Sequence, residues 1–169
     1  MEQNSYLQTK NYFKDIVEKS EFLNDFVGFF EREWTNRTAA VKNKILQSPT
    51  LALFRYELGF DGPDHNTIAV RKIGFAIMIN KVKQDDFEAQ YTAIHNAEQL
   101  ALKVLARIRL DSMTSTHWLY DSFLKESVEI KPVELSASEY GVDVLFNIKN
   151  KQSLKVDSTD WKDINEVCQ

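Results

Sequence analysis

The sequence predicts an α+β fold: a mixed or antiparallel sheet of about four strands, one long helix packed on one face, and a helical N-terminal segment. Two observations support this prediction. Apolar residues alternate over 73–79 and again over 142–148, which is the period of a strand with one buried face. Between these stretches, over 86–110, apolar residues recur every three or four positions, as in an amphipathic helix.

The length and composition fit one folded domain. A chain of 169 residues can bury a substantial core but is short for two domains. Apolar residues make up 43% and charged residues 27%, which is ordinary for a folded protein. We therefore predict an arm over 1–8, a single domain over 9–148 and a polar tail over 149–169. Within the domain, 9–47 is expected to be helical, and 51–148 to hold the sheet and the long helix.

The N-terminal part reads as aromatic-rich helices. Ser20 is the expected N-cap of a second helix, and Pro49 is expected to end a third one over 35–47. The first helix is expected to bury Phe13, Ile16 and Val17. On the second helix, one side is expected to carry Phe22, Phe26, Phe29 and Phe30, with Leu23 and Val27 alongside.

Two strands follow, joined by a tight turn. Residues 51–59 read as a strand, with a helical turn as the alternative, and 67–83 read as a long strand. The sequence Asp61-Gly62-Pro63-Asp64 predicts the turn, because Gly permits positive φ and Pro fixes φ. The second face of the long strand is small and apolar, which suggests that both of its faces are covered. That second face consists of Gly74, Ala76 and Met78.

The long helix over 86–110 is expected to begin at an Asp85 or Asp86 cap. Lys103, Arg107 and Arg109 near its end complement the helix dipole. Its apolar face is expected to contain Phe87, Tyr91, Ile94, Ala97, Ala101, Val104, Leu105 and Ile108.

After a polar loop over 111–122, the last two strands are expected to pair. The strand over 123–135 contains Pro132, which predicts a sheet edge or a bulge there. Tyr140 and Gly141 are expected to open the last strand, which runs to 148.

Composition excludes several classes of function. The net charge is −4 and no basic block is present, so tight binding of duplex DNA is not expected. No apolar run approaches the roughly 18–20 residues that cross a bilayer. The only cysteine is Cys168, and the polar stretch 1–10 does not resemble a signal peptide. We expect the protein to act in the cytosol or in a particle assembled there, without membrane contact.

No cluster of residues indicates catalysis. His65, His95 and His117 do not form a pair at metal-ligand spacing, so neither a metal nor a cofactor is expected. Asp61 and Asp64 lie next to His65, but their composition is that of a turn. Neither a nucleophile elbow nor a glycine-rich phosphate loop is present. We expect no catalytic residue and a protein that is not an enzyme.

Five residues are candidates for partner binding. The aromatic stretch 22–34 most simply packs on its own sheet, but Phe29, Phe30 and Trp34 are also suited to contact a neighbouring subunit. In the polar tail, Trp161 and Ile164 are isolated apolar anchors. Two such anchors cannot build a core of their own, so we expect them to dock on a partner or on the parent domain.

The order of elements resembles a known group of proteins. A strand at 68–82, a helix at 86–110 and strands at 124–135 and 141–148 resemble the head–tail connector, tail-completion and tail-terminator proteins of tailed phages. The run Tyr140-Gly141-Val142-Asp143-Val144-Leu145-Phe146 is similar to the closing hairpin of that group. The resemblance covers the middle half of the chain and is one of topology.

The resemblance implies a structural role in a virion assembled in the host cytoplasm. The chain would form a homo-oligomeric ring at the head–tail junction, next to portal, connector or tail-tube proteins. Genomic DNA would pass through the ring without being held tightly. The alternative is a cytosolic, non-enzymatic regulatory or ligand-binding α+β domain.

Overall fold

The computed structural model describes residues 5–29, 46–63, 66–154, 156 and 158–163. This part of the chain has an α+β fold with a mixed five-stranded sheet in the order β1-β2-β3-β5-β4. The predicted fold class is confirmed, with five strands where about four were expected. The elements are α1 (Tyr6–Lys19), β1 (Asp25–Val27), β2 (Thr50–Asp61), β3 (Ile68–Ile79), α3 (Phe87–Met113), β4 (Phe123–Ser136), β5 (Glu139–Lys151) and the short 3-10 helix η1 (Ser158–Asp160).

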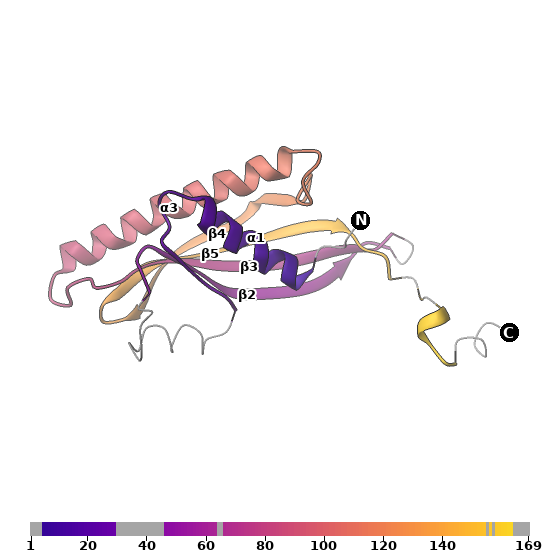
Figure 1. The fold of residues 1–169 in the computed structure, drawn as a ribbon, viewed down its shortest axis with the longest axis horizontal. Helices are drawn as coiled ribbons and strands as arrows, with labels where there is room; N and C mark the ends of the chain where they lie inside the picture. Colours follow the sequence, from indigo (N-terminus) through magenta and orange to yellow (C-terminus); the bar gives the residue numbers. More distant parts are fainter. Residues whose placement is uncertain (1–4, 30–45, 64–65, 155, 157, 164–169) are drawn as a thin grey trace.

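The helices α1 and α3 cover the same face of the sheet (Figure 1). The side chains between them form one apolar core, in which full burial of a large side chain contributes roughly 1.5–3 kcal/mol. The predicted packing of the long helix on the strands at 73–79 and 142–148 is thereby confirmed. The core includes Phe13, Leu51, Leu53, Ile73, Phe75, Ile77, Ala97, Ala101, Val104, Ile108, Val142, Val144, Phe146 and Ile148.

The N-terminal segment differs from the prediction. Ser5 caps α1 by accepting a 3.1 Å hydrogen bond from the Gln8 backbone N–H, so the predicted arm over 1–8 ends earlier. Ser20 ends α1 instead of starting a second helix, because its hydroxyl donates to the Val17 carbonyl at 3.0 Å. Residues 25–27 then pair with β2 as a parallel strand, so the second predicted helix is wrong over 21–29. The third predicted helix, over 35–47, lies mostly outside the described residues.

The sheet is antiparallel apart from β1. The turn between β2 and β3 contains Gly62 with φ +86°, as predicted. β4 lies at the sheet edge, which confirms one of the two expectations for Pro132. The irregularities of β4 lie elsewhere, after Leu124 and after Glu134.

The long helix and the last strand both extend further than predicted. Asp86 is the N-cap of α3, accepting from the Ala89 backbone N–H at 3.0 Å, and the helix ends three residues beyond 110. β5 continues to Lys151, because its last residues pair with the beginning of β3. The predicted tail therefore begins after residue 151, and η1 lies beyond the end of β5 (Figure 1).

Candidate interaction surfaces

The sheet face opposite the helices carries an apolar groove. The β2 strand has a bulge at Phe54, between Leu53 and Arg55, and the Phe54 ring lies over Gly74 of β3. A Cβ at Gly74 would be 2.8 Å from that ring, so only glycine permits this contact. The groove has a volume of about 390 Å³. It is lined by Val27, Gly28, Phe29, Ala52, Leu53, Phe54, Ala76, Met78, Val133, Leu135 and Asp143.

Among the described residues that line this groove, Asp143 is the only one with a charged side chain. Its neighbours across the sheet are Ala76 and Lys131, but the Lys131 ammonium bonds to Glu129 at 3.0 Å instead. Among the described residues, Asp143 therefore has no cation beside it. Burial raises the pKa of the Asp143 carboxyl above its ordinary value. A half-buried carboxylate in apolar surroundings is suited to meet a basic group on a partner.

A second surface follows the outer side of α3, where exposed apolar side chains lie together with the exposed polar residues His95 and Glu98. Tyr91 and Leu102 are separated by about three helical turns, so they lie on the same side of the helix, away from the core. This corrects the prediction that Phe87 and Tyr91 are core residues, since they are 70% and 67% exposed. Arg109 is exposed on the same helix. We call this the outer α3 surface, defined by Phe87, Tyr91, Leu102, Arg109 and Met113.

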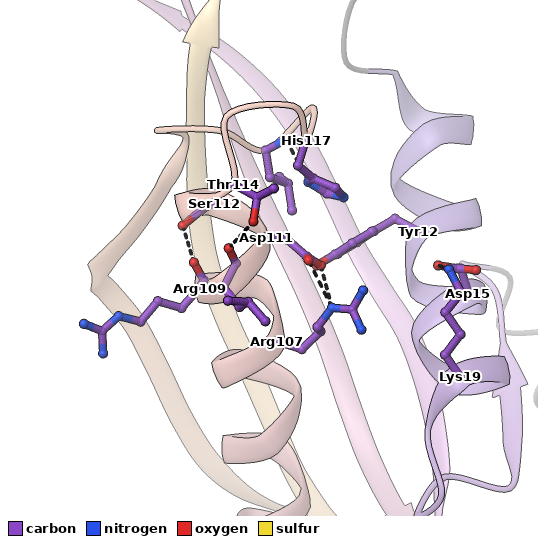
Figure 2. A network of polar contacts seen from close by, with 11 residues as sticks. Tyr12, Asp15, Lys19, Arg107, Arg109, Asp111, Ser112, Thr114 and His117 are labelled. Atoms are coloured by element: carbon purple, nitrogen blue, oxygen red, sulfur yellow. Dashed lines mark hydrogen bonds and ion pairs between the residues drawn. The ribbon is translucent and has the colours of Figure 1, made fainter.

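A buried polar network joins α1 to the end of α3 (Figure 2). The Tyr12 hydroxyl donates to Asp111 Oδ2 at 2.7 Å, and Arg107 Nε donates to both carboxylate oxygens at 3.0 and 2.9 Å. An acidic group is unfavourable at the C-terminal end of a helix, and these two donors compensate for it. Burial, and then the hydrogen bond to Asp111, strongly raise the pKa of the Tyr12 hydroxyl. Tyr12 therefore keeps its proton, which indicates an anchoring role for the network.

His95, His117 and Asp61 do not converge in the described part of the chain, and Asp64 and His65 lie outside it. His117 Nδ1 accepts from the Leu119 backbone N–H at 3.2 Å, and its ring lies beside Tyr12. His95 is exposed on α3. The Asp61 carboxylate accepts from the Gly62 N–H and pairs with Lys149, and these two contacts lower its pKa. No group of three His, Cys, Asp or Glu side chains suited to a metal occurs among the described residues.

The structure describes two of the five predicted partner-binding residues, Phe29 and Trp161. Phe29 packs on Tyr6 and Tyr56, with ring centroids 4.6 and 6.1 Å away, and also borders the groove. Trp161 is 59% exposed, next to η1. Phe30, Trp34 and Ile164 lie outside the described residues.

The groove and the outer α3 surface were not predicted as contact sites. The small residues Gly74, Ala76 and Met78 signalled a second buried face but not the residues that border it. The outer α3 surface could have been inferred from the helical repeat of about 3.6 residues per turn. That repeat places Tyr91 on the side of the helix opposite Ala93 and Ala97, which are buried.

Comparison with protein-family models and with curated proteins finds no match to this chain. Within the part of the chain that the structure describes, no helix combines the length and the apolar character needed to cross a bilayer. The phage resemblance therefore stays a prediction from the order of elements.

Proposed function

We propose that this chain is a non-enzymatic structural subunit of a phage virion that forms a ring at the head–tail junction around the DNA channel. The observation that carries the proposal is the presence of two different surfaces that carry apolar side chains, the groove and the outer α3 surface. They lie on opposite sides of the layered fold, one on the sheet face opposite the helices and one on the outer side of α3.

Two unlike surfaces suit a head-to-tail contact. A heterologous contact repeats from subunit to subunit and closes into a ring when the rotation allows it. In the proposed contact, the outer α3 surface of one subunit lies in the groove of the next. Arg109 then approaches Asp143 of the neighbouring subunit, and this pairing would place a cation beside a carboxylate that has none among the described residues.

The charge of the chain agrees with a DNA channel that does not hold DNA. Duplex binding draws most of its affinity from basic groups that neutralise phosphates. The net charge of −4 provides no such excess. DNA would therefore pass the ring without tight binding, and portal, connector or tail-tube proteins would be its neighbours.

The test combines imaging with mass measurement of the purified chain. We expect rings in negative-stain images. Leu135→Glu in the groove and Leu102→Glu on α3 should each prevent ring formation, because each places a charge in one half of the contact. In an equimolar mixture of the two variants, this contact should form once, between one subunit of each kind, and should not continue into a ring, because the other half of the contact is disrupted in each.

Leu7→Glu is the matched control, because Leu7 is exposed on α1 and belongs to neither surface. It should leave the rings intact. Rings that persist in both surface variants would contradict the proposed contact. A monomer that binds a small apolar amine would support the alternative, a ligand-binding domain, since the groove volume is in the range of ligand pockets.

A further inference from the structure

The sheet has two edges with opposite character. β4 carries Pro132, two irregularities and the charged residues Glu129 and Lys131, which are features that discourage pairing with another strand. On the other side, β1 pairs with β2 only as far as Ala52. Among the described residues, no strand pairs with the outer edge of β2 over 55–61. That stretch carries Leu58 and Phe60, which are 46% and 50% exposed.

We propose that the stretch 55–61 of β2 pairs in antiparallel fashion with the same stretch of a second copy, about a two-fold axis through Leu58. The contact is symmetric and uses an edge that the proposed ring contact leaves free. It therefore goes beyond the ring and does not depend on it. Pairing satisfies the open backbone groups of both strands at once.

Side-chain complementarity selects this register. Leu58 lies opposite Leu58 of the second copy, and Tyr56 lies opposite Phe60 of the second copy. Tyr56, Leu58 and Phe60 lie on one face of the sheet. Their partners on β3 are Ile73, Arg71 and Ala69, which are every second residue of that strand and so also share one face. On the other face, Arg55 lies opposite Asp61 of the second copy. The two-fold axis repeats this contact, so the dimer gains two ion pairs. Cross-strand pairs of these kinds stabilise antiparallel sheets.

Neighbouring registers are less favourable. An axis through Glu57 places the two Glu57 carboxylates opposite each other. An axis through Gly59 places Glu57 opposite Asp61 twice. An axis through Tyr56 extends the pairing to Ala52, where β1 already occupies the edge.

The charged groups are available for the new contact. Within the chain, Arg55 pairs with Glu57 at 2.7 Å and Asp61 with Lys149 at 3.5 Å. Both pairs are exposed, and exposed pairs contribute little to folding stability. Changing Arg55 or Asp61 should therefore affect the dimer far more than the fold.

The test is a charge exchange read out as molecular mass in solution, using the full-length chain in a Leu135→Glu background so that rings do not interfere. The parent should be a dimer. Arg55→Glu alone and Asp61→Arg alone should each be monomeric, because each places two like-charged pairs across the axis. An equimolar mixture of the two should restore a one-to-one dimer, since side chains of opposite charge then face each other at both ends of the contact.

Leu58→Lys gives a second test that does not depend on the ion pairs. It places two ammonium groups together at the axis and should dissociate the dimer, whereas Leu7→Lys on α1 should leave it intact. Thermal melting of each variant shows whether its fold is retained. A monomeric parent would overturn the proposal, and so would a mixture of the two charge variants that stays as monomeric as its components.

Discussion

At the scale of single residues, Gly141 shows how closely the two central strands of the sheet approach. It lies on β5 opposite Met78 of β3. A Cβ built on Gly141 would overlap the Ile77 carbonyl oxygen and lie 2.9 Å from the Met78 sulfur. The sulfur can move, but the carbonyl belongs to a paired strand and cannot. The start of β5 therefore requires glycine for space, not for an unusual φ.

We predict that Gly141→Ala destabilises the fold by roughly 1–3 kcal/mol, the usual cost of overpacking. Gly59→Ala on β2 is the matched control, because the nearest atom to a Cβ there is 3.9 Å away. The free energy of unfolding from denaturant titration is the measurement. Equal stability of the two variants would show that the strands can separate enough to admit a methyl group.

The residues at candidate surfaces were only partly predictable, because exposure depends on distant partners. Phe29 was singled out as a candidate for partner binding, and within the chain it packs on Tyr6 from α1 and Tyr56 from β2. Asp143 appears in the sequence as one polar residue among alternating apolar ones. Only the groove around it, formed by β2, β3 and β4, makes it a half-buried carboxylate.

At the scale of elements, the sequence predicted an element correctly where that element contains its own capping residue and its own repeat of apolar residues. The helix α3 has a capping carboxylate, a long apolar stripe and 27 residues, so the sequence predicted it well. β1 has three residues and exists because it pairs with β2. The helical spacing of Phe22, Phe26 and Phe29 could not reveal that distant pairing. The end of α3 was missed for a similar reason, since Tyr12 from α1 stabilises Asp111 there.

The cap of α3 gives a prediction at this scale. Asp86→Ala removes the hydrogen bond to the Ala89 N–H and a negative charge at the positive helix end, so it should cost about 0.5–2 kcal/mol. Asp85→Ala is the control, because Asp85 is exposed and is not the cap. Its effect should stay within about 0.5 kcal/mol. Urea titrations of both variants would reveal equal losses if the two carboxylates share the capping role.

At the scale of the whole molecule, the boundary between domain and tail lies later than composition suggests. Lys149, Asn150 and Lys151 look like the start of a polar tail, but they pair with Val70, Ala69 and Ile68. The buried Arg71 holds this end of β5, since its guanidinium donates to Asn150 and, at 3.2 Å, to Gln152. Beyond this point the described apolar side chains are exposed, namely Leu154, Val156 and Trp161.

Two truncations should therefore behave differently. Deleting 149–169 removes three paired residues of β5 and two acceptors of the buried Arg71, so it should destabilise the fold by at least about 2 kcal/mol. Deleting 154–169 keeps all of these contacts and should leave the melting temperature unchanged. It should still weaken assembly, because exposed apolar side chains on a polar tail are suited to dock on a neighbouring subunit or another particle protein.

Ordering such a tail costs on the order of 1 kcal/mol per residue in backbone entropy, so its anchors need a preformed surface to bind. Trp161→Ala in the full-length chain should then reproduce much of the assembly defect without altering the melting temperature. Melting curves and the ring yield, or the dissociation constant between subunits, are the measurements. If the shorter deletion unfolds the protein, the tail belongs to the core of its own domain; if it assembles with full affinity, the tail has no role in the contact.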